Sequence, residues 1–233
     1  MAFRFRHFIV EDDRSTMPVG TDAMLLGSWA DPGESRRILD IGTGCGVLAL
    51  MMAQRSGAFV EGIDKDPASA AQASGNFSAS PWSDRLASIC APVEEFSLRS
   101  QGRYDFIITN PPYFSRSLKS PSPVRTLARH ETGMSLQGLA DVLDRLLSPA
   151  GRFAVVLPVR VFRGFEESAG KKGFQEIKTM MVRSWRHKTP VRVLALFSKS
   201  AKSEAERQEL IIFDAPGRFT SGYLELTSDF HYF

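Results

Sequence analysis

Short apolar runs alternate along this chain with longer segments of helical pattern. The apolar runs predict buried strands, and leucines recurring every three or four residues within 135–151 predict a helix. The predicted strands cover 36–41, 58–64, 86–91, 104–109 and 151–158, and the predicted helices cover 45–57, 66–80, 135–151 and about 160–170. Asp66 and Pro67 fit a helix start, because Asp caps well and Pro suits the first helical position. This alternation predicts a parallel sheet covered by helices on both faces.

The two ends of the chain depart from this alternation. Two strand patterns, 174–182 and 191–199, follow each other without a helix, which predicts an antiparallel hairpin at the end of the sheet. The polar segment 201–209 is expected to form a loop. Residues 1–30 lie outside the pattern and are expected to pack over the open edge of the sheet. No repeat or linker interrupts the chain, so we expect a single α/β domain over 1–233.

Composition narrows the class of protein. The 233 residues include 29 Lys and Arg against 26 Asp and Glu, and a net charge of +3 does not by itself indicate a nucleic-acid partner. No apolar run reaches the ~18 residues of a membrane span, and the N-terminus, with arginines among aromatic residues, is unlike a secretory signal. Cys45 and Cys90 are the only cysteines, and no metal-ligand spacing occurs. We therefore expect a cytoplasmic protein that binds neither a metal nor a membrane.

A glycine-rich turn follows the first predicted strand in the sequence ILDIGTGCGVLAL. Its glycines would let a ligand lie against main-chain N–H groups. These are Gly42, Gly44 and Gly46. Val47 stands where a dinucleotide fingerprint has its third glycine, and the carboxylate of Asp40 would repel a pyrophosphate. The turn favours a ligand with a positive group, such as an ammonium or a sulfonium.

An acidic residue also ends the second predicted strand, in EGIDKDP. Asp64 follows Asp40 by 24 residues, and an acid at that place can accept hydrogen bonds from both hydroxyls of a ribose. The alternative is that Asp64 caps the next helix, but Asp66 already fits that role. Together with the glycine turn, this pattern predicts S-adenosylmethionine as the ligand.

The motifs DIGTGCG and EGID, with NPPY after the fourth strand, resemble the Rossmann-like class I methyltransferases that methylate amino groups. Further segments are similar to the bacterial tRNA1(Val) (adenine-37-N6)-methyltransferases. These are MPVGTDAMLLGSW (17–29), QASGNFSASPW (72–82), NPPYF (110–114), LARHE (127–131) and DFHYF (229–233), so the resemblance covers nearly the whole chain. It implies a mostly parallel, twisted sheet of seven strands with helices on both faces. It also implies S-adenosylmethionine as methyl donor and tRNA as partner, and we expect a monomer.

The tetrapeptide NPPY stands where a fourth strand would deliver its last residues toward the donor. The side-chain oxygen of Asn110 and the carbonyl of Pro111 can each accept one hydrogen of a planar amine, which turns the nitrogen lone pair toward the methyl group. The prolines stiffen the turn and donate no hydrogen bond. Pro112, Tyr113 and Phe114 are expected to line the substrate site, where Tyr113 offers a flat face to a base.

Two further segments gain a role from the resemblance. Thr21 and Asp22 would face the methionyl end of the donor, so that the lead-in segment packs over the donor site; the alternative is a simple helix cap. The Ser- and Pro-rich segment 115–131 would form a lid over the substrate. Within it, Arg129 and His130 are expected to contact the substrate, and His130 either acts as a base or anchors the loop.

The tetrapeptide alone leaves adenine N6, guanine N2 and a protein glutamine amide as acceptors. Only 39 residues precede Asp40, too few for the helical domain of glutamine methyltransferases. A chain of this length also lacks room for a duplicated half or a target-recognition domain. Size and resemblance favour adenine N6 of a tRNA at position 37. A guanine-N2 methyltransferase of ribosomal RNA and a non-catalytic RNA assembly factor that binds the donor remain as alternatives.

Basic residues add a candidate RNA surface. The segment RSWRHKTPVR (183–192) carries five Lys and Arg and no acid, and is either a solvated loop or a nucleic-acid contact. Trp185, with Phe3 or Phe5, could stack on bases. The candidate phosphate contacts are Arg4, Arg6, Arg125, Arg129, Lys171, Lys172, Arg183, Arg186 and Lys188.

Overall fold

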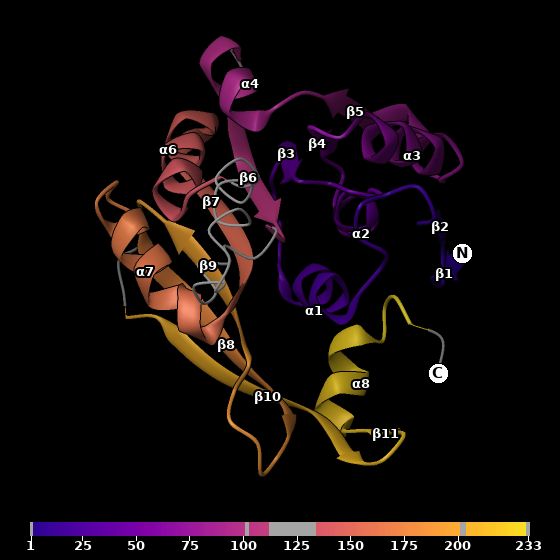
Figure 1. Cartoon of the computed structure of the whole chain (residues 1–233), viewed down its shortest axis with the longest axis vertical. Helices are drawn as coiled ribbons and strands as arrows, with labels where there is room; N and C mark the ends of the chain where they lie inside the picture. Colours follow the sequence, from indigo (N-terminus) through magenta and orange to yellow (C-terminus); the bar gives the residue numbers. More distant parts are fainter. Residues whose placement is uncertain (1, 101–102, 112–133, 201–203, 232–233) are drawn as a thin grey trace, which may run out of the picture.

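One nine-stranded sheet organises the part of the chain that the computed structural model describes, residues 2–100, 103–111, 134–200 and 204–231. Its strands lie in the order β11-β10-β8-β9-β7-β6-β3-β4-β5 (Figure 1). They are β3 (Arg37–Ile41), β4 (Phe59–Asp64), β5 (Leu86–Cys90), β6 (Tyr104–Thr109), β7 (Leu147–Pro158), β8 (Gln175–Trp185), β9 (Arg192–Ser198), β10 (Glu206–Ala215) and β11 (Arg218–Phe219). A separate antiparallel pair forms at the N-terminus from β1 (Ala2–Arg4) and β2 (Ile9–Glu11).

Strand direction decides which strand ends meet. The strands β5, β4, β3, β6 and β7 run parallel to one another. Because β9 is antiparallel to both β7 and β8, and β10 is parallel to β8, the strands β8 and β10 point the same way as β3. The carboxyl ends of β3, β6, β8 and β10 therefore share one edge of the sheet, and β9 begins at that same edge.

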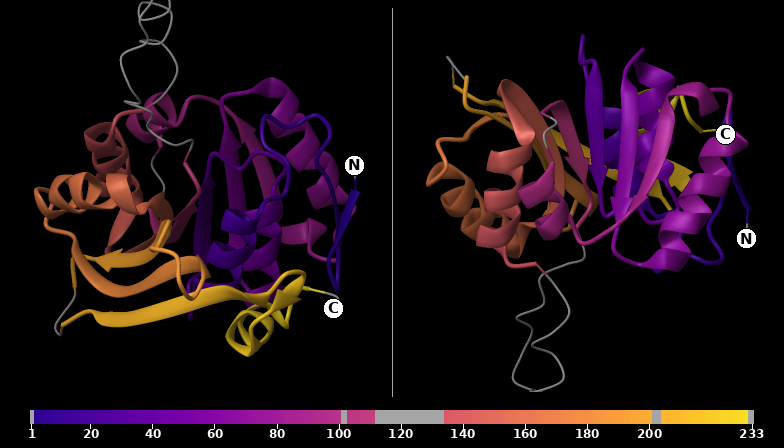
Figure 2. Two further views of the ribbon diagram at one scale, coloured as in Figure 1. Left: turned by 60° about the horizontal axis from the view of Figure 1, so that its bottom comes forward. Right: turned by 90° about the horizontal axis from the view of Figure 1, so that it is seen from above.

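Helices cover both faces of this sheet (Figures 1 and 2). On one face a hydrophobic core includes residues of α1 (Thr21–Trp29), α2 (Val47–Arg55), α3 (Pro67–Ser78) and α8 (Ser221–Thr227). The other core includes residues of α4 (Val93–Arg99), α6 (Leu136–Leu146) and α7 (Val159–Gly170). Ile38 and Phe106 pack in the first core, whereas their neighbours Leu39 and Ile107 pack in the second, as the two-residue period of strands requires. None of the helices described is long and apolar enough to cross a bilayer.

Several predictions from the sequence pattern are confirmed. The four predicted strands before residue 110 are β3 to β6, and the antiparallel hairpin is the pair β8 and β9. The start of α3 is also as expected, with Pro67 first in the helix and Asp66 Oδ2 accepting the Ser69 N–H at 2.9 Å. Local sequence was sufficient to predict these elements. A strand that is buried on both faces carries a continuous apolar run, and only a few residue types cap a helix well.

One helix end differs from the prediction. The helix predicted over 135–151 ends at Leu146, and β7 begins at Leu147 rather than at residue 151. Pro149 lacks an N–H and disfavours the helical conformation at the residue before it, so the helix stops early. Leu147 pairs with Tyr104, and an irregular register then follows before Arg152 pairs with Phe106.

The sheet is also wider than the seven strands expected. The expected seven are present, and β10 and β11 extend the sheet beyond β8. The predicted loop 201–209 was wrong for its last residues, since β10 starts at Glu206. The first half of β10 is polar and exposed, and ion pairs from Lys178 to Glu206 and from Arg183 to Glu209 connect it to β8. Strand pairing across the chain, not local pattern, makes this segment a strand.

The N-terminal segment follows α3 instead of the open edge of the sheet. Gln72 accepts the Arg14 N–H at 3.0 Å, and Ser69 Oγ accepts the Thr16 N–H at 3.2 Å. Helix α1 then packs against α2, α8 and β7. This path brings residues 17–23 over the sheet edge at which β3 and β6 end.

Candidate active site

A cavity of about 320 Å³ opens at the edge where β3 and β6 end. Neighbouring parallel strands bring the loop after β3 beside the loop after β6, which is where open sheets of this kind bind ligands. The start of α1 and the start of β9 complete its walls. We call it the edge pocket; its lining residues are Met17, Pro18, Gly20, Thr21, Asp22, Ala23, Gly42, Thr43, Gly44, Cys45, Val47, Leu48, Asn110 and Arg192.

The three predicted glycines of the turn differ in their surroundings. Gly42 and Gly44 have φ of 71° and 55°, and no atom lies within 4 Å of a Cβ built on either one. Gly46 has φ of 87°, but a Cβ there would lie 2.5 Å from the ring of Phe77 in α3. Gly42 and Gly44 therefore leave open space at the edge pocket, whereas Gly46 allows close packing of the turn against α3 and does not line the pocket.

The expectation that the turn offers free N–H groups was wrong for four of its amides. The N–H groups of Gly42 and Thr43 donate to the Ile63 carbonyl at 2.9 and 3.0 Å. The Gly44 N–H donates to Asp64 Oδ2 at 2.9 Å, and the Gly46 N–H donates to the Thr43 carbonyl at 2.8 Å. Ile63 and Asp64 of the neighbouring strand β4 thus accept three of these hydrogen bonds, so these N–H groups are not available to bind a phosphate. This agrees with the exclusion of a pyrophosphate ligand.

Asp40 lies beneath the turn and is fully buried. Its Oδ2 accepts the Thr43 hydroxyl at 2.6 Å and the Ala49 N–H at 3.2 Å, so it connects the turn to α2. Its Oδ1 has no hydrogen-bond partner among the described residues, and burial raises the pKa of Asp40 to about 7. Asp40 does not line the edge pocket; Thr43 stands between them. A direct contact with the donor stays a prediction for this residue.

We expect Asp40→Asn to change the pH dependence of folding. Because burial raises the folded-state pKa from 3.8 to about 7, the folded state binds more protons than the unfolded state between these values, and wild-type stability falls as pH rises through this window. Asn cannot ionise, so the variant should gain about 4 kcal/mol relative to the wild type between pH 4 and pH 7. Urea denaturation of both proteins at matched pH measures this gain. If the stabilities of the two proteins changed in parallel with pH, the pKa of Asp40 would not be raised in the folded state.

Asp64 ends β4 and is half-buried. Its Oδ2 accepts the Gly44 N–H and its Oδ1 accepts the Asp66 N–H, each at 2.9 Å. Each carboxylate oxygen keeps a second lone pair, so a ribose contact is compatible with these bonds and stays a prediction. The helix-cap alternative does not apply to Asp64, because Asp66 caps α3.

Asn110 follows β6 directly and lines the edge pocket. Its Oδ1 is buried and has no hydrogen-bond partner among the described residues. Native proteins pair most buried polar atoms, so a buried acceptor without a partner in a pocket wall indicates a ligand that donates to it. Pro111 is buried beside it. The other predicted substrate contacts lie outside the described residues: Pro112, Tyr113, Phe114, Arg129, His130 and the predicted lid 115–131.

Thr21 and Asp22 both line the edge pocket, as expected of donor contacts. The helix-cap alternative is not observed, because the N-cap of α1 is Gly20 and no side chain caps the helix. Asp22 Oδ2 instead accepts a hydrogen bond from Arg192 Nε at 2.9 Å. The sequence analysis missed Arg192 as a pocket residue. It was predictable in principle, since an antiparallel β9 has to begin at the edge where β3 ends.

Asn76 of α3 supports the site without lining the edge pocket. Its Oδ1 accepts the Glu11 N–H at 3.0 Å, and its Nδ2 donates to the carbonyls of Glu11 and Cys45, both at 2.8 Å. Cys45 is buried and lines the edge pocket. Asn76 therefore holds the N-terminal segment and the glycine turn on one helix, which fixes two walls of the pocket relative to each other.

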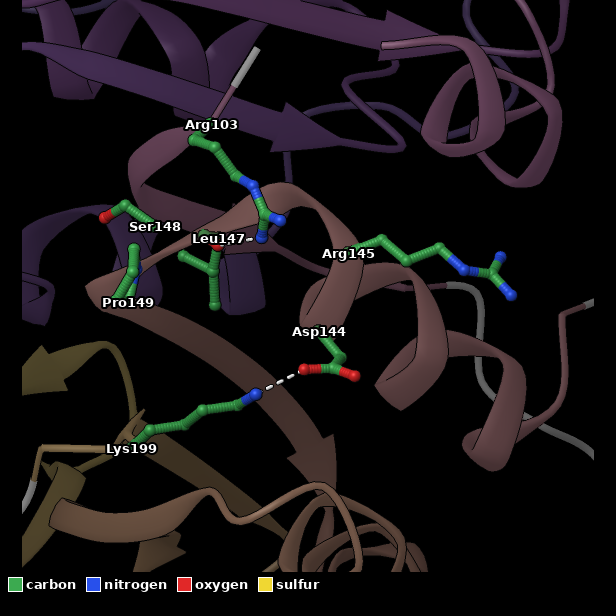
Figure 3. A pocket seen from close by; sticks show the side chains of 7 residues that line it. All are labelled: Arg103, Asp144, Arg145, Leu147, Ser148, Pro149 and Lys199. Carbon is green, nitrogen blue, oxygen red and sulfur yellow. Dashed lines mark hydrogen bonds and ion pairs between the residues drawn. The ribbon is translucent and has the colours of Figure 1, made fainter. Parts of the chain in front are cut away.

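Another cavity, of about 580 Å³, lies at the opposite end of the strands (Figure 3). Arg103 precedes β6, whereas Asn110 follows it, so the six residues of the strand separate them by about 20 Å. Two of its cations have protein partners, since Arg103 donates to the Leu147 carbonyl at 3.0 Å and Lys199 pairs with Asp144. This cavity is not part of the edge pocket. Within the described ranges, no three His, Cys, Asp or Glu residues gather as metal ligands would.

Solved structures of methyltransferases share this fold. A structure from Agrobacterium tumefaciens named as a "predicted O-methyltransferase" is 19% identical, with a TM-score of 0.69, and the match covers 90% of this chain and 96% of that chain. The Thermus thermophilus 16S rRNA N2 G1207 methyltransferase, in complex with AdoMet and guanosine, is 22% identical with a TM-score of 0.58; the match covers 85% of this chain and 50% of that one. These likenesses confirm the predicted class I methyltransferase fold.

Sequence comparison goes further. The model of the methyltransferase small domain family matches residues 16–131. Proteins named tRNA1(Val) (adenine(37)-N6)-methyltransferase are 37% identical in Bacteroides fragilis strain YCH46, over 98% of this chain and 97% of that protein, and 39% identical in Pectobacterium carotovorum, over 99% and 94%. The resemblance found in the motifs is thereby confirmed over almost the whole chain. The chain belongs to the tRNA1(Val) (adenine(37)-N6)-methyltransferase family.

Proposed function

We propose that this chain transfers a methyl group from S-adenosylmethionine to the exocyclic N6 of an adenine in tRNA, at position 37 beside the anticodon of tRNA1(Val). Family membership at 37–39% identity supports the substrate. The observation in the structure that carries the proposal is the buried Oδ1 of Asn110, which has no hydrogen-bond partner among the described residues and lies in the wall of the edge pocket. A tRNA substrate also fits the cytoplasmic location expected from the sequence.

The edge pocket has features that suit this donor. Open space at Gly42 and Gly44 admits a ligand close to the backbone. Asp22 in the wall is paired with Arg192, and Asp40 below it is buried with a raised pKa, so the open space, and not a net negative charge, is what suits the donor. Thr21 lines the wall beside Asp22. Asp64 is not among the lining residues, but it accepts the Gly44 N–H of the turn and keeps lone pairs for ribose hydroxyls. When bound, S-adenosylmethionine supplies a methyl group on a sulfonium sulfur.

Asn110 and Pro111 orient the acceptor. The amine of adenine is a weak nucleophile, because its lone pair is delocalised into the ring. Asn110 Oδ1 and the Pro111 carbonyl each accept one amine hydrogen, which directs the lone pair toward the methyl carbon. A nitrogen–carbon bond forms as the sulfur–carbon bond breaks, and the nitrogen then loses one proton to water. No side chain has to remove a proton first, so the role of His130 stays open to test.

The activity is tested with total tRNA from cells that lack this protein, incubated with the purified chain and labelled S-adenosylmethionine. Digestion to nucleosides should yield labelled N6-methyladenosine. A tRNA1(Val) transcript should be methylated once, and the same transcript with guanine in place of adenine 37 should not react. Labelled N2-methylguanosine in a parallel assay with ribosomal RNA would favour the guanine alternative. Donor binding without any product would favour an assembly factor.

A further inference from the structure

A column of aromatic rings crosses the sheet edge next to the edge pocket. Consecutive ring centroids are 5.3 Å apart for Trp185 and Phe213, 5.1 Å for Phe213 and Phe219, and 4.4 Å for Phe219 and Tyr223. The planes of Phe213 and Phe219 differ by 24° and those of Phe219 and Tyr223 by 15°, so these rings stack, whereas Trp185 is tilted by 33° against Phe213. Phe213 and Phe219 are only half-buried. An apolar core would bury these rings completely, so the column leaves aromatic surface open to a partner.

Strand register explains why the column stands at this edge. Trp185 ends β8 and is paired with Phe213 of the parallel strand β10, and Phe213 is paired with Phe219 of β11. The carboxyl ends of β8 and β10 lie at the same edge of the sheet as those of β3 and β6. The column therefore lies at the edge where β3 and β6 end, although its residues come from the last 50 residues of the chain.

A groove connects this column with the edge pocket. The cavity has a volume of about 490 Å³, and its walls include Phe213, Phe219 and Tyr223. We call it the aromatic groove. It shares four lining residues with the edge pocket: Gly20, Thr21, Asp22 and Arg192. The ion pair of Asp22 and Arg192 thus stands between the two cavities, and a chain-like substrate could occupy both.

The turn between Ser184 and Val191, two residues that line the groove, carries exposed positive charge. The turn after β8 carries Arg186 and Lys188, which are exposed and form no ion pair within the described ranges. The nearby Arg183 and Arg218 differ, because they pair with Glu209 and Asp214. Aromatic surface beside unneutralised cations is the combination with which proteins hold unpaired nucleotides.

We propose that the aromatic groove binds an unpaired nucleotide that flanks the target adenine. Its base contacts Phe213 and Phe219, and its phosphate lies near Arg186 and Lys188. The inference rests on the proposed function, since it assigns this groove to the same RNA. It also gives the enzyme a reason to prefer a single-stranded loop, because a paired neighbour could not enter the groove.

The test measures RNA affinity with a tRNA1(Val) anticodon stem-loop, in the presence of S-adenosylhomocysteine. Phe213→Leu keeps apolar volume but removes the ring, and should weaken RNA binding about tenfold or more. Phe162→Leu is the matched control, because Phe162 is also half-buried but lies on the opposite face of the sheet. The control should bind RNA as the wild type does, and both variants should bind S-adenosylhomocysteine normally.

Stem-loops with an abasic site at position 36 or position 38 identify the base. If the groove holds that base, the abasic RNA binds the wild type about tenfold more weakly, and Phe213→Leu adds little further loss on it. The double variant Arg186→Ala, Lys188→Ala should lower the slope of log affinity against log salt by about one, because both cations are assigned to one phosphate, whereas Arg160→Ala on α7 should leave the slope unchanged.

Two outcomes separate this inference from the proposed function. If the wild type methylates adenine 37 but Phe213→Leu binds every stem-loop as tightly as the wild type, the groove assignment is wrong and the activity stands. Equal losses for Phe213→Leu on the intact and both abasic stem-loops would also overturn the assignment, because they would show a general structural effect. If the wild type does not methylate the transcript at all, the proposed function itself fails.

Discussion

Asn110→Ala is expected to lower kcat for methyl transfer about 10²–10³-fold, the loss typical of removing one preorganised polar group from an active site. Within the part of the chain that the structure describes, the Oδ1 of Asn110 has no partner to lose, and it lies in the wall of the edge pocket. Folding should therefore suffer little, and the affinity for S-adenosylmethionine should change less than kcat does. Single-turnover methylation of the tRNA1(Val) transcript measures the rate, and calorimetric titration measures the donor affinity.

Asn110→Asp is the matched variant, because it keeps an acceptor oxygen at the same distance from the backbone. It should retain more activity than Asn110→Ala if acceptance of an amine hydrogen is the function of this side chain. A rate for Asn110→Ala close to that of the wild type would contradict the proposed orientation of the amine. Equal activity of the two variants would show that the Oδ1 acceptor is not what matters.

Gly46→Ala should unfold the protein more easily than Gly42→Ala or Gly44→Ala does. All three positions have positive φ, which costs an alanine about 1–2 kcal/mol. At Gly46 the new Cβ would also lie 2.5 Å from the buried ring of Phe77, and overpacking adds about 1–3 kcal/mol. The expected total is roughly 2–5 kcal/mol for Gly46→Ala and about 1–2 kcal/mol for the other two. Urea denaturation without ligand measures the difference.

Donor affinity should follow the reverse order. A methyl group at Gly42 or Gly44 projects into space that the protein leaves open, where it would meet the bound donor. A clash of about 1–3 kcal/mol corresponds to a Kd for S-adenosylmethionine roughly 5- to 150-fold higher. Gly46→Ala, at a temperature where it stays folded, should bind the donor with nearly wild-type affinity. Donor affinity that is unchanged in Gly42→Ala and Gly44→Ala would place the ligand elsewhere.

Most of the fold could be predicted from local pattern, and the errors have a common cause. The strands β3 to β6 are buried on both faces, so each one carries an apolar run that stands out. By contrast β10 begins with exposed polar residues that pairing with β8 turns into a strand. A contact between distant segments leaves no local periodicity, and so the strand count and the loop at 201–209 were mispredicted.

The site shows the same division. The residue types around the glycine turn and Asn110 were sufficient to predict that these segments meet, because parallel strands bring their carboxyl ends to one edge, and both line the edge pocket. Pattern could not distinguish Gly46 from Gly42, since the difference is the ring of Phe77 across the turn. It also could not show that Asp40 is fully buried beneath Thr43.

The sequence by itself predicted most of the strands and helices, the class of ligand and the resemblance to one family, because these predictions depend on local pattern and on short motifs. Only the tertiary structure decided which polar atoms remain without a partner, which glycines face open space, and that Arg192 pairs with Asp22. It also brought Trp185 and Phe213 to the edge where β3 and β6 end. The physical reason is that these properties depend on neighbours from distant segments, and only the folded sheet fixes their distances.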